Sequence, residues 1–245
     1  MRRGAGLDET NMFVTIMFMP PRRTPVSRRD RPAKPPLSRD GVVAVALRIL
    51  REEGLERVTM RRLAAELDTG PASLYVYVQN MAELHGAVLD ALLTGLPLPA
   101  ADAPEQARDA LIDLLSAYTG LLFEHPSLAR SVLTLWPSGP NYLLLVDALL
   151  GLLAALGVTP QQAAWGVDIL LQHATASAAE HATRFESVEA GSEWEGLASA
   201  VRGAPETVYP NIARHREELL GGAGEQRLRW AFAALVAGIA ATSPE

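Results

Sequence analysis

The stretch that decides the fold runs from residue 47 to residue 84 and reads LRILREEGLERVTMRRLAAELDTGPASLYVYVQNMAEL. Thr59 can cap the N-terminus of a short helix, although Arg62 three residues later means that no capping box forms. Residues 68–70 (Asp-Thr-Gly) predict a tight turn, and Pro71 suits the first position of the next helix. The stretch therefore predicts two short helices joined by a turn, which is a helix-turn-helix unit.

Helices on both sides complete a small domain. The preceding helix begins after Ser38 and ends at Gly54, a residue common after a helix C-terminus. The following helix begins after Asn80, with Glu83 in a capping-box-like position. Apolar residues at helical spacing predict the buried faces: Val42, Val43, Ala46, Leu47, Leu50, Leu63, Ala64, Leu67, Leu74, Val78, Leu84, Val88, Leu89 and Leu92. Residues 38–95 are therefore expected to form a three-helix DNA-binding domain of the helix-turn-helix type.

The second helix of such a unit presents its N-terminal residues to base edges in the major groove, while the first helix braces on the backbone. Ala72 and Ser73 are small enough for this approach, and Tyr75 and Tyr77 can donate hydrogen bonds to phosphates. The partial positive charge of the helix N-terminus adds attraction for DNA. Core packing is the alternative for the two tyrosines.

Residues 47–67 and 71–84 resemble the signature of the TetR/AcrR family of transcriptional regulators, and the Tet repressor branch in particular. The matching positions are Gly54, Thr59, Arg61, Leu63, Ala64, Leu74, Tyr75, Tyr77, Val78, Asn80 and Leu84. The resemblance implies that DNA is contacted around Thr59, Met60, Arg61, Pro71, Ala72, Ser73, Tyr75, Val76, Tyr77 and Met81. Two positions depart from the pattern. Asp68 replaces a glycine but tolerates left-handed backbone, and Met81 replaces a basic residue and removes a phosphate contact.

Charge is divided unevenly along the 245 residues. Residues 1–67 carry 14 Lys and Arg against 8 Asp and Glu, whereas the rest carries 8 against 20, for a formal net charge of −6. A basic front and an acidic rear indicate that only the front meets a polyanion, the alternative being a charged tail beside an ordinary acidic domain. The absence of Cys excludes disulfides, thiolate metal sites and Cys nucleophiles, and is compatible with the expected cytoplasmic location.

The N-terminal 37 residues are expected to be a flexible basic extension. Residues 20–37 are dense in proline and arginine, which prevents helix formation and favours extended chain. This arm is expected either to contact phosphates non-specifically or to remain a solvated tail. Met12, Met17 and Met19 are alternative start sites. No membrane partner is expected, because residues 143–158 carry Asp147 and fall short of the roughly 20 residues that a span requires.

Residues 104–245 are expected to form an all-helical ligand-binding and dimerisation domain. Its helices are predicted at 104–124, 126–136, 140–156, 160–185, 192–202, 206–219 and 224–241, and no alternating strand pattern occurs. The helices at 160–179 and 228–241 are apolar all round, which predicts burial. The resemblance to the Tet repressor implies that this pair forms a four-helix bundle across a two-fold axis, in a homodimer. A monomer with a central helix is the alternative.

A small-molecule effector would require an apolar cavity with a few polar groups. The candidate lining residues are Tyr118, Leu122, His125, Trp136, Trp165, Gln172, His173, Ser177 and Phe185. Glu180 falls where the Tet repressor has an acidic residue that helps to hold a magnesium–drug chelate, but the expected metal-coordinating His is replaced near Val132. His173 and His181 are two turns apart and restore no metal spacing, so no metal and no other cofactor is expected.

These observations predict an all-α, ligand-responsive regulator. It would bind a palindromic operator in double-stranded DNA as a dimer, most simply as a repressor that a small-molecule effector releases. An activator and a ligand-independent DNA-binding protein remain open, because the position of the operator decides between repression and activation. An all-helical enzyme is the remote alternative, since the sequence contains no HExxH, GxSxG, P-loop or dinucleotide-binding fingerprint.

Overall fold

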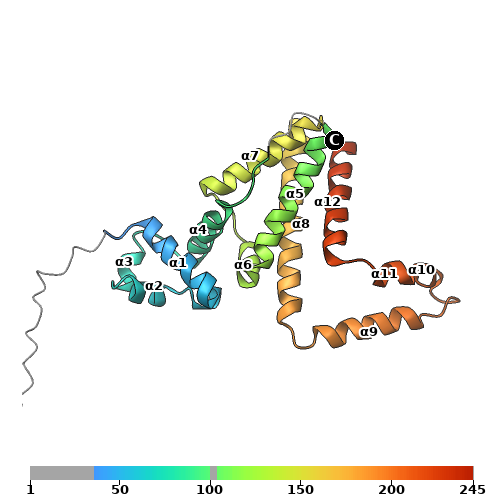
Figure 1. Cartoon of the computed structure of the whole chain (residues 1–245), viewed down its shortest axis with the longest axis horizontal. Helices are drawn as coiled ribbons and strands as arrows, with labels where there is room; N and C mark the ends of the chain where they lie inside the picture. Colours follow the sequence, from blue (N-terminus) through green and yellow to red (C-terminus); the bar gives the residue numbers. More distant parts are fainter. Residues whose placement is uncertain (1–35, 100–103, 245) are drawn as a thin grey trace, which may run out of the picture. The chain divides into compact units, whose positions relative to one another are not determined.

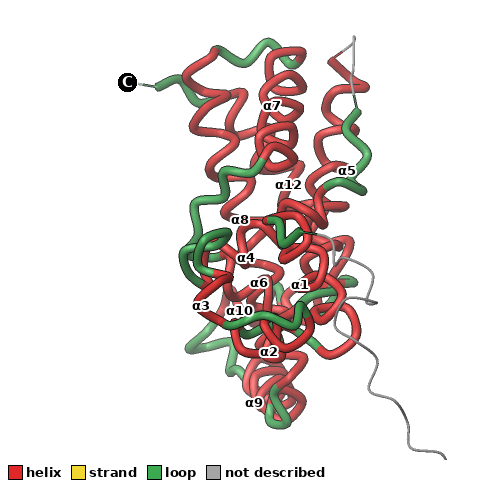
Figure 2. Tube along the Cα trace, turned by 90° about the vertical axis from the view of Figure 1, so that its left-hand side faces the viewer, coloured by secondary structure: helices red, strands yellow, loops and turns green. Residues whose placement is uncertain are grey.

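Helices are the only regular elements in the part of the chain that the computed structural model describes, residues 36–99 and 104–244 except for the side chain of Phe185 (Figures 1 and 2). The all-α prediction is therefore confirmed. Residues 1–35, which include most of the predicted basic arm, lie outside the described part of the chain. No helix in the described part is both long enough and apolar enough to cross a bilayer.

The N-terminal helices begin at the predicted caps. Ser38 Oγ accepts the N–H of Gly41 at 3.1 Å, Thr59 Oγ1 accepts that of Arg62, and Asn80 Oδ1 accepts that of Glu83. Each bond satisfies a backbone donor that the first helical turn leaves free. The resulting helices are α1 (Arg39–Glu53), the 3₁₀ turn η2 (Leu55–Arg57), α2 (Met60–Glu66), α3 (Pro71–Leu74) and α4 (Met81–Leu93).

The turn between α2 and α3 has the geometry expected of the helix-turn-helix unit. Asp68 has φ 48°, the left-handed region that glycine usually occupies. Aspartate is among the residues that tolerate this conformation, so its substitution for glycine leaves the turn intact. Pro71 begins α3 directly after Gly70, as predicted.

The remaining helices build a bundle around α8 (Pro160–Glu186). α5 (Pro104–Phe123), α6 (Pro126–Val132), α7 (Pro140–Ala155) and α12 (Gly224–Ala241) all pack against it. α4 contacts α1 as well as α6 and α7, and one apolar core runs from Ile49 in α1 to Phe232 in α12. From Leu37 onward the described chain is a single compact unit.

Two predicted helices are shorter than expected. The helix predicted at 126–136 ends at Val132, and the following segment contains Pro137, which disfavours helical backbone at the residue before it. The helix predicted at 206–219 is divided into α10 (Pro210–Arg214) and α11 (Arg216–Leu220). Pro210 cannot continue a helix from its N-terminal side, and His215 interrupts the remainder with φ −113° and ψ 19°.

The two helices expected to be buried all round are only partly covered within one chain. Trp165 and Ile169 of α8 are 56% and 44% exposed, and Trp230 of α12 is 72% exposed. The opposite sides of both helices are buried, through Leu170 and Phe232 among others. α9 (Ala190–Gly203) follows α8 and packs with α10 and α11 (Figure 1).

Candidate DNA interface and ligand cavities

The helix α3 and the two residues after it present small and aromatic side chains to solvent. Pro71, Ala72 and Ser73 of α3 are exposed, and Tyr75 and Val76, directly after the helix, are 52% and 81% exposed. The intervening Leu74 and the later Val78 are fully buried and anchor the segment in the core. These exposed residues belong to the second helix of the helix-turn-helix unit and to the residues directly after it, and the second helix of such a unit is the one that enters the major groove, so this surface is the candidate DNA interface.

The other predicted DNA contacts divide between surface and core. Thr59 and Arg61 are exposed at the start of α2, but the side chain of Met60 is buried in the core. Burial leaves the backbone N–H of Met60, rather than its thioether, available at the helix N-terminus. Tyr77 and Met81 are partly buried against the core, so packing accounts for part of both side chains.

A shallow depression at the start of α2 adds Arg57 to the candidate surface, a residue absent from the predicted contacts. Its volume is about 310 Å³, and its lining includes Arg57 together with Thr59, Arg61 and Arg62. Arg57 belongs to η2 and reaches the same surface because η2 leads directly into α2. The sequence could have indicated this position, because Arg57 lies only two residues before the Thr59 cap.

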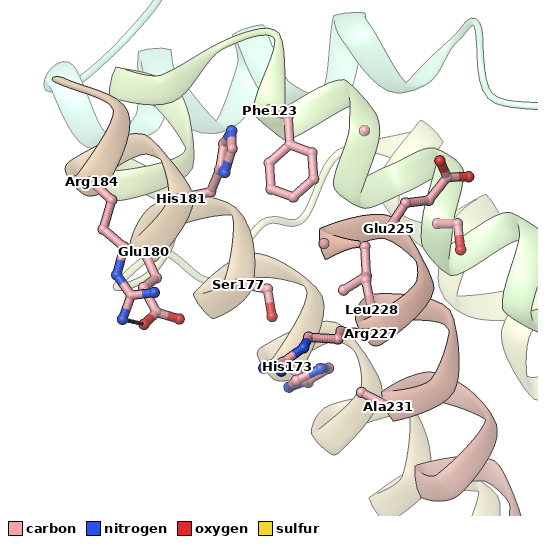
Figure 3. Close-up of a pocket in the computed structure, with 13 residues that line it drawn as sticks. Phe123, His173, Ser177, Glu180, His181, Arg184, Glu225, Arg227, Leu228 and Ala231 are labelled. Atoms are coloured by element: carbon pink, nitrogen blue, oxygen red, sulfur yellow. Dashed lines mark ion pairs between the residues drawn. The ribbon is translucent and has the colours of Figure 1, made fainter. Parts of the chain in front are cut away.

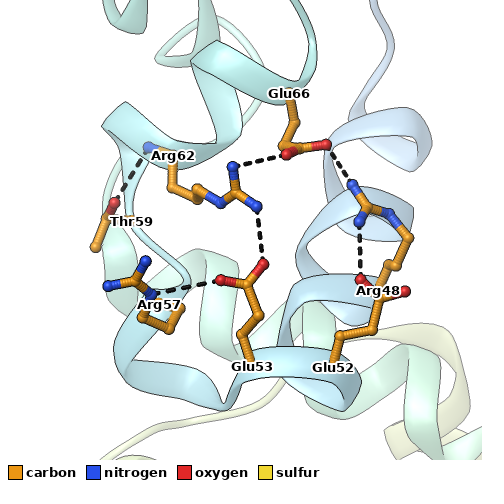
Figure 4. Close-up of polar contacts among 7 residues, drawn as sticks. All are labelled: Arg48, Glu52, Glu53, Arg57, Thr59, Arg62 and Glu66. Atoms are coloured by element: carbon orange, nitrogen blue, oxygen red, sulfur yellow. Dashed lines mark hydrogen bonds and ion pairs between the residues drawn. The ribbon is translucent and has the colours of Figure 1, made fainter.

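An ion-pair network fastens α2 to α1 (Figure 4). Arg62 lies at its centre and contacts Glu53 at 2.8 Å and Glu66 at 2.7 Å, while Glu66 also contacts Arg48 at 2.5 Å. The hydrogen bond from Arg62 lowers the pKa of the Glu53 carboxyl. Because these pairs are partly exposed, they set the orientation of α2 more than they add stability.

A cavity of about 530 Å³, here called the α7 cavity, opens between α5, α7, α8 and the segment that follows α6. It contains three of the predicted ligand residues, Tyr118, Trp136 and Gln172. The remaining lining residues are Val132, Leu133, Thr134, Leu135, Pro137, Tyr142, Val146, Ala164, Val167, Asp168, Leu171 and Thr175.

The polar groups of the α7 cavity are mostly neutral. Tyr118 is buried, and its hydroxyl lies 3.1 Å from Thr175 Oγ1. Burial raises the pKa of Tyr118 to about 12, so the phenol stays protonated. Burial also raises the pKa of Tyr142, and the negative charge of Asp168 raises it further. Asp168 is the one charged side chain among the described lining residues.

A second cavity of about 720 Å³, here called the α12 cavity, opens between α5, α8 and α12 (Figure 3). It contains the predicted ligand residues His173 and Ser177. Glu180 pairs with Arg184 at 2.6 Å, and Arg227 donates to backbone carbonyls at the end of α11, including that of Leu219. The charged residues of this cavity are therefore largely occupied within the chain.

The other predicted ligand residues line neither cavity. Leu122 is fully buried in the core, His125 precedes α6, and Trp165 is exposed on α8. The side chain of Phe185 lies outside the described residues. The prediction missed Asp168 and Thr175, which line the α7 cavity. They lie on the same face of α8 as Gln172, because residues 168, 172 and 175 follow the i, i+4, i+7 spacing of one helix face. This spacing could have identified them from the sequence.

The segment between α6 and α7 borders both the α7 cavity and helices α1 and α4. Leu135, Trp136 and Pro137 line the α7 cavity and also a groove of about 440 Å³ against α1 and α4, in which Asp90 takes part. Asp90 is buried and accepts the backbone N–H of Tyr142 at 2.9 Å. This contact connects α4 directly to the first turn of α7.

Asn141 strengthens the connection between α4 and α7. Its Nδ2 donates to the backbone carbonyl of Asp90 at 3.0 Å and to a carboxylate oxygen of the same residue at 3.1 Å. It also lies 3.2 Å from Thr94 Oγ1. Helix α4 is therefore bonded to the first turn of α7 through the Asn141 side chain and the Tyr142 backbone N–H.

A second polar connection leads from η2 to the end of α8. Glu56 accepts a hydrogen bond from Ser127 of α6, and this bond lowers the pKa of the Glu56 carboxyl. Arg130 donates to Ser127 Oγ at 3.2 Å and pairs with Glu186 at 2.9 Å. α6 is thus bonded to η2 through Ser127 and to the end of α8 through Arg130.

Comparison with known proteins gives two family matches. The model for bacterial regulatory proteins of the tetR family matches residues 42–88, and the tetracyclin repressor-like C-terminal domain matches residues 100–242. Over 217 residues the chain is 30% identical to a helix-turn-helix-type transcriptional regulator of Saccharopolyspora erythraea, which covers 86% of this chain and 87% of the relative.

Solved structures of similar proteins cover nearly the same span. The transcription regulator SCO7704 from Streptomyces is 52% identical to this chain and superposes on it with a TM-score of 0.72. The match covers 86% of this chain and 98% of that one. ActR from Streptomyces coelicolor, solved in complex with actinorhodin, is 32% identical, with a TM-score of 0.74 and coverage of 86% and 98%. Both matches extend over the DNA-binding segment and the helical bundle together.

Proposed function

Since the chain belongs to the TetR family of bacterial regulatory proteins, we propose that it is a ligand-responsive repressor. In this proposal it binds a palindromic operator as a homodimer and leaves the DNA when a small molecule occupies the α7 cavity. The family and the relatives are transcriptional regulators, which confirms that the chain is not an enzyme. Residues 38–95 would read the DNA, and residues 104–245 would bind the ligand and form the dimer.

The observation that carries the proposal is the shared segment between α6 and α7. Leu135, Trp136 and Pro137 border the α7 cavity on one side and the groove against α1 and α4 on the other. A ligand that displaces this segment therefore acts on the helices that hold α3. The structure of ActR with actinorhodin supports the idea that a small molecule is the signal.

DNA binding is assigned to the exposed face of α2 and α3. The exposed residues of that face are Thr59, Arg61, Pro71, Ala72, Ser73, Tyr75 and Val76. The small residues at the start of α3 allow the backbone to approach base edges, and the tyrosine hydroxyl and Arg61 suit phosphates. Met60, Tyr77 and Met81 would contribute through backbone contacts or the exposed parts of their side chains.

The dimer is assigned to the exposed sides of α8 and α12. Trp165, Ile169 and Trp230 are large apolar side chains that a monomer would leave in water. Packing these sides against the same sides of a second copy gives a self-complementary interface, as two-fold symmetry requires. The spacing of the two α3 helices then has to match one helical turn of DNA, so a small change in spacing releases the operator.

The energy that such a switch requires is modest. An effector that prefers the DNA-incompetent state about a hundredfold supplies about 2.7 kcal/mol of coupling. One ligand in a cavity of 530 Å³ can supply this difference if its contacts differ between the two states.

A gel-shift experiment tests the proposal. Purified full-length protein is incubated with DNA fragments that flank its own gene, at low salt, with and without candidate ligands. We expect a retarded complex of dimer size that an effector dissolves, and a transcription assay on the same promoter that shows repression. Failure to bind any fragment would overturn the proposal, and increased transcription would identify an activator instead.

A further inference from the structure

The charge of the α7 cavity indicates the chemical class of its ligand. Among the described lining residues, Asp168 carries a negative charge, and no Lys, Arg or His is present to balance it. The α12 cavity differs, because its lining includes Arg184, Arg227, Glu180 and Glu225 together. The side chains that line the α7 cavity therefore carry only negative charge, whereas those that line the α12 cavity carry charges of both signs.

The aromatic side chains of the α7 cavity add a second attraction of the same sign. Trp136 is 93% exposed and Tyr142 is half-buried, so ring surface is available to a ligand. The faces of aromatic rings attract cations through their quadrupole. Asp168 acts on the same region, because its charge raises the pKa of the Tyr142 phenol beyond the effect of burial.

The deep end of the cavity is uncharged, and its two hydroxyl groups bond to each other. Tyr118 and Thr175 bond to each other at 3.1 Å and are both buried. Val167 and Leu171 line the wall beside them. This end suits an uncharged, mainly apolar part of a ligand, whereas the exposed end with Asp168 suits a charged group that keeps part of its hydration.

We infer that the effector of the α7 cavity is a cationic aromatic compound, whose ring system fills the apolar end and whose positive charge lies against Asp168 and the nearby aromatic rings. The inference rests on the proposed function, since it assigns a ligand class to the proposed effector site. An anionic aromatic ligand is disfavoured there, because it would approach an unbalanced carboxylate with no cationic partner.

Three probes with the same tricyclic ring system and different charges test the inference. They are N-methylacridinium, acridine at mildly alkaline pH, where it is neutral, and acridine-9-carboxylate. Binding to the full-length protein is measured by calorimetry. We expect N-methylacridinium to bind about tenfold more tightly than acridine, which corresponds to about 1.4 kcal/mol, with acridine-9-carboxylate the weakest.

Two variants locate the effect. Asp168→Asn preserves the shape of the side chain and removes its charge, so we expect cation binding to weaken about tenfold and acridine binding to stay unchanged. Asp147→Asn is the matched control, because Asp147 is an exposed aspartate of α7 that lines neither cavity. We expect the Asp147→Asn variant to bind all three probes with the same affinity as the original protein.

Several outcomes overturn the inference. They are equal or tighter binding of acridine-9-carboxylate, an Asp168→Asn variant that keeps the cation preference, and an Asp147→Asn variant that loses it equally. Absence of binding by all three probes also overturns it. The proposed function is judged separately, by the operator gel shift on the same protein samples, so the two failures remain distinguishable.

Discussion

The carboxylate of Asp90 lies where a side chain on Gly139 would have to lie. A Cβ atom on Gly139 would be 2.2 Å from Asp90 Cγ, far inside van der Waals contact. The absence of a side chain at residue 139 therefore lets α4 approach the start of α7 closely enough for Asp90 to bond with Tyr142. The connection between the two halves of the regulator depends on this glycine.

Substitution of Gly139 by alanine should destabilise the fold. The added methyl group forces Asp90 out of its site and breaks its bond to Tyr142, and we expect the free energy of unfolding to fall by about 1–3 kcal/mol. Urea denaturation measures the change. Gly151→Ala within α7 is the control, because its added Cβ would meet no side chain of another residue within 4 Å, its two chain neighbours aside. The control should be neutral or gain up to about 1 kcal/mol. Equal stability of both variants would contradict the role assigned to the Asp90 contact.

Removal of the Tyr75 hydroxyl should weaken operator binding. The side chain is 52% exposed on the proposed DNA face, so Tyr75→Phe should keep the fold and lose one hydrogen bond to phosphate. We expect a loss of about threefold to tenfold in affinity, similar for all DNA sequences, because phosphate contacts carry no sequence information. Quantitative gel shifts measure it. Tyr209→Phe, at an exposed tyrosine before α10, should bind as the original protein does, and a Tyr75→Phe variant with full affinity would show that Tyr75 does not contact DNA.

A charge on the exposed side of α12 should dissociate the dimer. Trp230→Glu places a carboxylate where we propose that two copies pack, and we expect the dimer to weaken at least about thirtyfold, or about 2 kcal/mol. Sedimentation equilibrium measures the dissociation constant. Trp194→Glu on α9 is the control, since Trp194 is likewise an exposed tryptophan but lies outside the proposed interface. If the two variants dissociate alike, or if neither does, the assignment of α8 and α12 to the interface is incorrect.

Stability should fall at mildly acidic pH because of His85 in α4. Burial lowers the pKa of this histidine from its ordinary 6.5. Below pH 6.5 the unfolded chain therefore binds more protons than the folded one, and the free energy of unfolding decreases until the pH passes the lowered pKa. Above pH 6.5 this effect is absent. Urea titrations across this range should show a shallower decrease for His85→Gln, whereas His215→Gln at an exposed position should keep the original slope. Identical slopes in all three proteins would count against the effect of His85.

The order of the helices, their caps and the helix-turn-helix unit could be predicted from the sequence because local interactions determine them. Ser38, Thr59 and Asn80 bond to backbone donors three residues away, and Asp68 adopts the positive φ that its short polar side chain tolerates. The resemblance to the TetR/AcrR signature implied that Tyr75, Val76 and Tyr77 face outward, and Tyr75 and Val76 are exposed whereas Tyr77 is partly buried. None of these features requires knowledge of which distant helix lies opposite.

The cavities and the connections between the two halves depend on residues that are far apart in the chain. Tyr118 meets Thr175, and Asp90 meets Tyr142, across separations of more than fifty residues. Helical periodicity shows which residues share a face, but it does not show which helix that face meets. For this reason the predicted ligand residues were divided between two cavities, the core and the surface. The positions of Asp168, the Asp90 contact and the partly exposed sides of α8 and α12 were determined by tertiary packing, because long-range contacts alone bring those helices together.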